Sequence, residues 1–395
     1  MRQIAENQQD ELLTIQDSQR IRIWAVTWNH GGALLHKREL SAFWSAVPTG
    51  SSHIIVIASQ ECGEISGSAI NADKSEWEQY LQGQMSGQNY VLLAGRGLGA
   101  THCAVFVHKH LLPICGSVHT SAIACGIGNT LGNKGGVGIG LRVGHTSLLL
   151  VACHLASGQR KVAERNADVL AIDSRLQLVG PTQSSTSHAS RATLRFDRVL
   201  WCGDMNYRVA GQRAQVERWL DANNHAACVA ADQLTQQRAT GKLLPGLSEG
   251  PLHFPPTYKL DLVERAADSD GNGTRPPTMQ SGPFYDTGPK QRVPSWTDRV
   301  LFKPHDSRMA LLHYDALMHV AESDHRPVVA QFSMKLKTHL KDVEAMPHPQ
   351  EWLLPQHVDE HVAHVSARGA AAAASPVSPQ FVPVGHTESQ SCCLQ

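Results

Sequence analysis

Short apolar stretches recur between residues 20 and 335 of this chain, and Gly, Pro, Asn or Ser residues separate them. Residues 21–28 alternate apolar and polar side chains, which predicts a strand. Residues 53–59 form an almost continuous apolar run, which predicts a strand buried on both faces. The same patterns predict further strands over residues 90–93, 102–108, 114–120, 137–143, 147–154, 197–202, 298–303, 309–314 and 326–335.

Helical spacing of apolar residues covers 157–178, where residues such as Val169 and Ile172 recur between charged positions. Two further helices are predicted near 211–222 and 229–239. Strands outnumber helices, and hairpin-like connections join many of them. We therefore expect a four-layer α/β sandwich, in which two packed, mostly antiparallel β-sheets are flanked by helices.

Composition divides the chain into three parts. Residues 1–18 are polar and predict an N-terminal arm, residues 19–338 predict a globular body, and residues 339–395 are rich in Pro, His and Ala, as in flexible tails. Within the body, residues 267–280 are a polar insertion of Asp, Gly, Asn, Thr and Pro.

Charge and cysteine usage narrow the functional classes. Lys+Arg and Asp+Glu number 35 each, so the formal net charge is zero, whereas proteins that grip nucleic acid along a groove usually carry a basic excess. The nine cysteines are scattered without a Cys-x-x-Cys pair, which argues against a zinc ribbon or a disulfide scaffold. The N-terminal residues show no apolar signal core, and no run is long enough to span a bilayer. A reducing, cytoplasmic location is expected.

Polar side chains stand at the ends of the predicted strands. Taken singly, each could be a helix cap, a turn residue or a hydrogen-bonded interior histidine. Their repetition at strand ends suggests instead that they gather at one edge of the sandwich. The residues concerned are Asn29, Glu61, His154, Asp204, Asn206, Asp298, Asp324 and His325.

The segment 203–208 concentrates this chemistry, because an acid, an amide, a phenol and a guanidinium follow one strand within five residues. An acid can orient a water, an amide can hold it or a metal, and an arginine can bind a second anion. Hydrolysis of a phosphate ester needs this combination. A polar turn is the alternative for this segment taken alone.

Eight motifs in this order resemble the catalytic domain of inositol polyphosphate 5-phosphatases, within the superfamily of exonucleases, endonucleases and phosphatases. The resemblance covers roughly residues 20 to 335, and the Gly-Asp-x-Asn-Tyr-Arg and Trp-x-Asp-Arg elements are its most specific parts. The motifs are 27–32 (TWNHGG), 59–61 (SQE), 132–137 (GNKGGV), 153–158 (CHLASG) with 164–166 (ERN), 203–208 (GDMNYR), 254–259 (FPPTYK), 290–299 (KQRVPSWTDR) and 323–328 (SDHRPV).

The resemblance implies a Mg²⁺-dependent enzyme, and the residue types agree, since carboxylate and amide oxygens are ligands that suit Mg²⁺. Glu61 is expected to bind the metal directly, with Asn29 beside it. Asp204 would orient and activate the attacking water, and Asn206 would fix the position of that water. The expected attack is in line, without a covalent intermediate.

The remaining polar residues are expected to stabilise the transferring phosphoryl group. His325, oriented by Asp298, would donate to its oxygens from one side, and His154 would do so from the other. Asp324 would support the water shell of the metal. Thr297 stands where the family usually has Cys, His30 replaces a small or β-branched residue, and Gln291 interrupts what is usually a longer basic run. These departures bear on fine substrate preference more than on activity.

Cationic and aromatic residues near these motifs are candidates for binding the other phosphates of a polyphosphorylated ring. The resemblance implies that Tyr207, Arg208 and Lys259 hold the neighbouring 4-phosphate. A solvated surface charge is the alternative for any one lysine, although the glycines around Lys134 would let backbone N–H groups approach a phosphate. The full set is Lys134, Tyr207, Arg208, Lys259, Lys290 and Arg292.

The expected substrates are inositol phosphates or phosphoinositides such as phosphatidylinositol 4,5-bisphosphate or 3,4,5-trisphosphate, and a monomer is expected. The final residues resemble a prenylation box at Cys392, although Cys393 occupies an aliphatic position. One lipid chain would give reversible association with the cytoplasmic face of membranes. The alternatives are a nuclease or other phosphodiesterase of the same superfamily and a catalytically silent lipid-binding module.

Overall fold

The computed structural model describes residues 20–35, 40–63, 74–126, 134–178, 191–262, 285–304 and 308–337. The predicted N-terminal arm, the polar insertion 267–280, the tail and Cys392 lie outside these residues. Within them, no helix is long and apolar enough to cross a bilayer.

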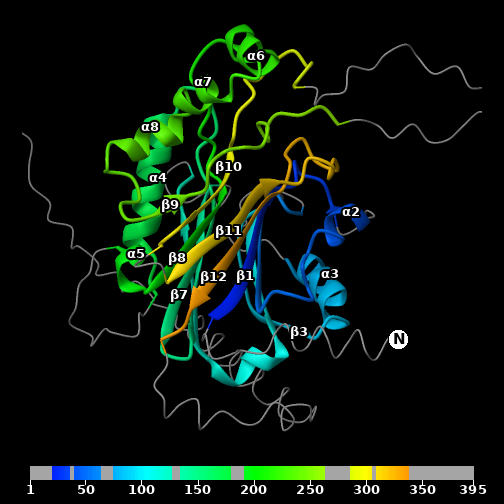
Figure 1. Ribbon diagram of the computed structural model, residues 1–395, viewed down its shortest axis with the longest axis vertical. Helices are drawn as coiled ribbons and strands as arrows, with labels where there is room; N and C mark the ends of the chain where they lie inside the picture. Colours follow the sequence, from blue (N-terminus) through cyan, green and yellow to red (C-terminus); the bar gives the residue numbers. More distant parts are fainter. Residues whose placement is uncertain are drawn as a thin grey trace, which may run out of the picture.

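Two six-stranded sheets form the centre of the molecule (Figure 1). The first has the order β11-β12-β1-β2-β4-β3, and the second has the order β5-β6-β7-β8-β10-β9. The first sheet consists of β1 (Arg20–Asn29), β2 (Ile54–Gln60), β3 (Tyr90–Leu98), β4 (Thr101–His108), β11 (Met309–Ala316) and β12 (Val328–Lys335). The second consists of β5 (Cys115–Ala124), β6 (Gly135–Val143), β7 (Thr146–His154), β8 (Arg198–Asp204), β9 (Ser248–Glu249) and β10 (Asp298–Phe302).

Each sheet contains one parallel pair of strands in a mostly antiparallel arrangement. β1 pairs in parallel with β2, and β7 pairs in parallel with β8. A third strand lies antiparallel beside each parallel pair: β12 pairs with β1, and β10 pairs with β8. Each of these antiparallel strands begins at the edge where the parallel pair ends. Both sheets therefore bring two strand ends and one strand start to a common edge.

Helices cover the outer faces of both sheets. α2 (Ser41–Trp44) and α3 (Ser75–Ser86) lie on the first sheet, where Phe43, Trp77 and Leu81 pack with Trp28. The second sheet carries α4 (Val162–Arg175), α5 (Ala192–Arg195) and α8 (Gln233–Ala239) on its outer face (Figure 1). α6 (Arg213–Asp221) and α7 (His225–Ala230) lie at the top of this view, and their buried residues Val216 and Cys228 belong to the main core. A short 3₁₀ helix, η2 (Lys109–Ile114), precedes β5. The predicted four-layer sandwich is confirmed.

The main core lies between the sheets, because alternate strand residues point inward. Ile23 and Ala25 of β1 and Leu150 of β7 belong to it, whereas Val26 packs outward beneath α3. Burial of both faces explains the apolar continuity of the central strands. Burial of an apolar side chain contributes roughly 1.5–3 kcal/mol, so this double burial stabilises the sheets that carry the polar strand ends.

Glycines on one face of β6 allow the outer layer to approach closely. A Cβ at Gly136 would lie 2.9 Å from Ile172 of α4, and a Cβ at Gly140 would lie 2.8 Å from Phe196. The intervening residues Val137 and Ile139 face the main core. The Gly-x-Gly-x-Gly pattern therefore fits a strand that packs tightly on one side and fills a core on the other.

The predicted strands are all present, with ends shifted by a few residues. The helix predicted over 157–178 is wrong at its start, because 155–160 is a loop and α4 begins at Val162. The helix predicted near 229–239 is two helices, α7 and α8, separated at Ala231 and Asp232, where Asp232 caps α8. α3 and β9 were not predicted, since polar residues dominate α3 and β9 has only two residues.

Gly203 is required by the close approach of β7 to β8. Its φ is +151°, and an added Cβ would lie 2.1 Å from the carbonyl oxygen of Cys153. We expect Gly203→Ala to lower the free energy of unfolding by roughly 2–5 kcal/mol, combining backbone strain with overpacking. Urea denaturation measures this change. The control is Gly87→Ala, at an exposed position with φ −69° and no neighbour within 4 Å of the new methyl; equal stability of the two variants would contradict the steric argument.

Candidate active site

Strand register brings the predicted polar residues to one edge. Asn29 pairs with Gln60 at the ends of β1 and β2, so Glu61 follows directly at the same edge. His154 pairs with Asp204 at the ends of β7 and β8, and Asp298 pairs with Asp204 at the start of β10. Side chains that are far apart in the sequence therefore converge because the strands are in register.

Asn29 links the acids of the two sheets. Its Nδ2 donates to Asp204 Oδ2 at 2.9 Å and lies 3.3 Å from Glu61 Oε1. Its Oδ1 accepts the backbone N–H of Gly31 at 2.9 Å, so the amide oxygen is already engaged. In this arrangement the amide nitrogen of Asn29 orients two carboxylates. This agrees with the predicted position of Asn29 beside a metal ion that Glu61 would bind.

Asp204 lies at the end of β8 and is buried. Burial alone would raise the pKa of its carboxyl, but the hydrogen bond with the His154 ring and the charges of His325 and Lys134 hold that pKa well below its usual range. Asn206, in a left-handed conformation with φ +57°, donates its backbone N–H to Asp204 Oδ1 at 3.0 Å and its Nδ2 to Asp204 Oδ2 at 3.2 Å. Asp204 is therefore an ionised carboxylate held by several donors.

His325 and Asp298 form a buried pair. His325 Nδ1 lies 2.9 Å from Asp298 Oδ2, and the hydroxyls of Thr257 and Thr297 donate to the same oxygen at 2.9 and 2.8 Å. Burial disfavours a charged imidazole, but the Asp298 carboxylate outweighs it and raises the pKa of His325 to about 9. His325 is thus a cation at neutral pH, and Thr297, which departs from the family pattern, supplies a hydroxyl to its partner.

Ser323 fastens the turn that carries Asp324 and His325. Its hydroxyl donates to the carbonyl oxygen of Asn29 at 2.7 Å and accepts the backbone N–H of His325 at 3.2 Å. The indole Nε1 of Trp28 donates to the His325 carbonyl at 3.2 Å. The turn before β12 is therefore tied to the end of β1, where Asn29 stands.

Lys134 and His154 bring positive charge to the acids. His154 Nε2 lies 3.3 Å from Asp204 Oδ2 and 3.7 Å from Glu61 Oε1, and Lys134 Nζ contacts the same ring nitrogen. Burial lowers the pKa of both groups, and the charge of Lys134 lowers that of His154 further. His154 is accordingly a neutral imidazole beside a lysine.

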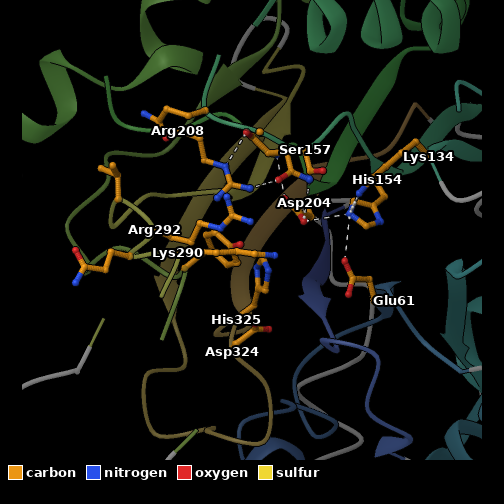
Figure 2. A pocket seen from close by; sticks show the side chains of 16 residues that line it. Glu61, Lys134, His154, Ser157, Asp204, Arg208, Lys290, Arg292, Asp324 and His325 are labelled. Atoms are coloured by element: carbon orange, nitrogen blue, oxygen red, sulfur yellow. Dashed lines mark hydrogen bonds and ion pairs between the residues drawn. The ribbon is translucent and has the colours of Figure 1, made fainter. Parts of the chain in front are cut away.

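A cavity of about 540 Å³ opens over these residues. Figure 2 shows Glu61, His154 and Lys134 on one side of it, with Arg208, Lys290 and Arg292 on the other. Its lining consists of Glu61, Lys134, His154, Ser157, Gly158, Gln159, Asp204, Asn206, Arg208, Tyr258, Lys290, Gln291, Arg292, Val293, Asp324 and His325. We call Arg208, Lys290 and Arg292 the cationic wall.

Two predicted substrate-binding residues lie elsewhere. Tyr207 is buried, and its hydroxyl donates to Asn166 Oδ1 at 2.6 Å, away from the cavity lining. Lys259 lines a neighbouring cavity of about 460 Å³, and its Nζ lies 3.2 Å from Asp324 Oδ2. Asp324 lines both cavities, so Lys259 is bound to a residue that the two cavities share.

Tyr258 is a lining residue that sequence reasoning passed over. Its ring contacts two cationic groups, with the guanidinium carbon of Arg208 4.3 Å from the ring centroid and the His325 ring centroid also at 4.3 Å. Ser157 and Gln159 line the cavity as well. For Tyr258 and Ser157 the available signal was their position within the motifs 254–259 and 153–158, beside Lys259 and His154; Gln159 directly follows the second of these motifs.

The donor set at the edge fits a hard divalent cation. Glu61 has a φ of +50°, and its partly exposed carboxylate faces the same Asn29 amide nitrogen as the buried carboxylate of Asp204. Deeper in the site, ligand atoms of Asp204, Asp298 and His325 lie within 4.8 Å of one another. Because Asp298 and His325 already bind each other, the Glu61 side offers the freer oxygen ligands, which suit Mg²⁺ or Ca²⁺.

Comparison with known proteins identifies the family. Residues 26–331 match the endonuclease/exonuclease/phosphatase family 2 model. A Rattus norvegicus phosphatidylinositol polyphosphate 5-phosphatase type IV is 32% identical over 339 residues, covering 83% of this chain and 48% of the relative. Inositol-1,4,5-trisphosphate 5-phosphatase 1 of Schizosaccharomyces pombe is 30% identical over 334 residues, covering 81% of this chain and 28% of the relative. The chain thus spans about half or less of the length of these curated relatives, and it belongs to the endonuclease/exonuclease/phosphatase family 2.

A solved structure agrees with this assignment. The inositol polyphosphate 5-phosphatase domain of SPsynaptojanin, in complex with inositol (1,4)-bisphosphate and calcium ion, superposes with a TM-score of 0.66 at 26% identity. The match covers 94% of this chain and 97% of that domain. The resemblance recognised in the motifs is therefore confirmed at the level of family and fold.

The raised pKa of His325 depends on Asp298. We expect Asp298→Asn to lower the His325 pKa from about 9 by at least one unit, because the neutral amide no longer offsets burial. Titration of the histidine ring by NMR measures it, with exposed Asp221→Asn as control. Since the folded-state pKa lies above the ordinary 6.5, the stabilisation is present below 6.5 and is lost as the pH rises through about 9. An unchanged pKa in Asp298→Asn would contradict the pairing.

Proposed function

We propose that this chain is a Mg²⁺-dependent phosphatase that removes the 5-phosphate from inositol polyphosphates or phosphoinositides. One observation carries the proposal: a single cavity joins an ionised Asp204, a cationic His325 and the cationic wall. Such a site presents hydrogen-bond acceptors for water and positive charge for several phosphates at once. The family and the names of the relatives support the same activity.

Glu61 would hold the metal, with Asp204 and Asn29 beside it. When bound there, Mg²⁺ supplies Lewis-acid polarisation of the scissile phosphate and neutralises charge on the leaving oxygen. Glu61 is suited to this task because its side chain is partly exposed at the cavity while the backbone around it is fixed by β2.

Asp204 orients the attacking water by accepting its hydrogen bond. A carboxylate whose pKa lies far below neutrality is a weak base. Asp204 therefore acts by orienting the water more than by taking a proton from it. Asn206 fixes the carboxylate through two hydrogen bonds. His325, charged through Asp298, donates from Nε2 to the phosphoryl oxygens and offsets the negative charge that moves during the reaction.

The cationic wall recognises the phosphate next to the scissile one. Arg208 is stacked on Tyr258, and its guanidinium is therefore held in one orientation. Lys290 and Arg292 extend from the loop before β10, which Asp286 fixes by accepting the backbone N–H of Arg292 at 2.6 Å. A phosphoinositide substrate would bring the protein reversibly to a membrane surface.

The rival activities are separated by one panel of substrates. Phosphate release is measured with soluble inositol phosphates and with vesicles that contain phosphoinositides, and nicking is measured with plasmid DNA. We expect phosphate release from inositol substrates and no nicking, because the cations form one compact wall on a chain of zero net charge. Nicking without phosphate release would favour the nuclease, and binding of vesicles without either reaction would favour the lipid-binding module.

Asp204→Asn tests the water-orienting role. The variant keeps the size of the side chain but loses its charge, so we expect phosphate release to fall by roughly 10²- to 10⁴-fold. Thermal unfolding checks that the variant is folded, and the exposed Asp221→Asn variant, at the end of α6, serves as the matched control. Turnover of Asp204→Asn within about twofold of wild type would remove Asp204 from the mechanism.

Glu61→Gln tests the metal site. We expect chelation to abolish phosphate release and Mg²⁺ to restore it, and the variant to require about tenfold more Mg²⁺ or greater. A binding readout independent of turnover is the Mg²⁺-dependent rise in melting temperature, which should be present in wild type and diminished in Glu61→Gln. Equal Mg²⁺ responses in the two proteins would place the metal elsewhere.

A further inference from the structure

Gln233, the first residue of α8, lies behind the cavity and contacts two of its sides. Its Oε1 accepts the backbone N–H of Arg208 at 2.9 Å and the Nη2 of Arg165 at 2.7 Å, and its Nε2 donates to the carbonyl oxygen of Gln159 at 2.9 Å. Neither Gln233 nor Arg165 is part of the cavity lining, whereas Arg208 and Gln159 are. One buried amide thus connects two lining segments.

Arg165 carries the connection into the loop before α4. The side chain is fully buried, and its Nη1 donates to the carbonyl oxygens of Gly158 at 2.7 Å and Ala156 at 3.2 Å. Gln159 Nε2 donates in turn to the Val209 carbonyl at 2.7 Å. Hydrogen bonds therefore connect the loop before α4 with the segment that follows Asn206, and the Gln233 side chain bonds to both of them.

The backbone of α8 also holds Arg208, independently of the Gln233 side chain. The N–H of Gln233 donates to the Arg208 carbonyl at 2.9 Å, and the N–H of Ala210 donates to the Ala231 carbonyl at 2.7 Å. Removing the side-chain amide consequently leaves this segment attached to α8. What is lost is the acceptor that fixes the Arg208 N–H, and with it the place of the backbone from which the Arg208 side chain, held by Asn206 and Tyr258, reaches the cavity.

We propose that Gln233 is a positioning residue that sets the place of Arg208 in the cationic wall and so the recognition of a phosphate next to the scissile one. This inference rests on the proposed function. Gln233 touches no substrate, and it acts through the Arg208 backbone. Its substitution therefore affects the binding of substrates that carry the adjacent phosphate more than it affects the rate of the chemical step.

Two substitutions isolate the acceptor. Gln233→Met has a similar length but accepts no strong hydrogen bond, whereas Gln233→Glu keeps an oxygen for the Arg208 N–H and for Arg165. Both variants lose the donor to Gln159. Gln233→Glu keeps the acceptor and adds a carboxylate charge beside Arg165, so recovery in Gln233→Glu together with loss in Gln233→Met assigns the effect to the acceptor oxygen. Gln236→Met is the matched control, because Gln236 lies on the same helix and its Nε2 donates to Ala230 at an exposed position.

The experiment compares kcat and KM for two soluble inositol phosphates with Mg²⁺, one with phosphates at positions 4 and 5 and one with the 5-phosphate but no 4-phosphate. For Gln233→Met we expect KM for the first substrate to rise about 3- to 10-fold, the worth of one buried hydrogen bond. We expect kcat to stay within about twofold, and KM for the second substrate to be unchanged. Gln233→Glu and Gln236→Met should behave as wild type.

Other outcomes overturn the inference in distinguishable ways. A wild-type enzyme that prefers the first substrate, together with a Gln233→Met variant that keeps the full preference, refutes the role of Gln233 while the proposed function stands. An equal loss on both substrates, or a loss shared by Gln233→Glu, assigns Gln233 a purely structural role. A wild type that releases phosphate from neither substrate refutes the proposed function as well. If Gln233→Met does not fold, Gln233→Ala, which retains the backbone bond to Arg208, carries the same expectation.

Discussion

The whole site depends on the register of two parallel strand pairs, one in each sheet. β1 and β2 deliver Asn29 and Glu61 to the edge where β7 and β8 deliver His154 and Asp204. The hydrogen bond from Asn29 to Asp204, at 2.9 Å, joins the two sheets at that edge. Because side chains alternate along a strand, a slip of one residue in β8 would point Asp204 to the opposite face. The packed cores that fix the register therefore also fix the geometry of the candidate active site.

Burying charged side chains at this edge costs desolvation free energy, and pairing between opposite charges offsets that cost. An isolated buried ion costs several kcal/mol, so each charged group here has partners. Asp204 is held ionised by donors from three strands or their ends, and His325 is held charged by Asp298. In the proposed reaction, the same low-polarity surroundings would strengthen the action of these charges on a phosphate. Outside this edge, Arg299 is paired with Asp232 and with Glu249 as a structural cluster beneath α8.

Strand prediction succeeded because burial on both faces produces apolar runs that are visible without knowing the partner strand. The helix α3 was missed because Trp77, Leu81 and Met85 are its buried residues in an otherwise polar segment, and packing on the first sheet stabilises it. The start of α4 was misplaced because the loop before it is held by Arg165, whose carbonyl partners are not apparent from spacing.

The sequence by itself determined the succession of strands along the chain and the acids, amides and histidines at their ends. From these residues followed the family and the proposed class of chemistry. Tertiary structure alone decided the direction of side chains in the loops. Tyr207 turns into the interior while Tyr258 stacks on Arg208, and Lys259 lies against Asp324. The reason is physical: strand periodicity assigns a residue to a face, whereas a loop side chain is placed by contacts with residues distant in the sequence, and no local pattern records those contacts.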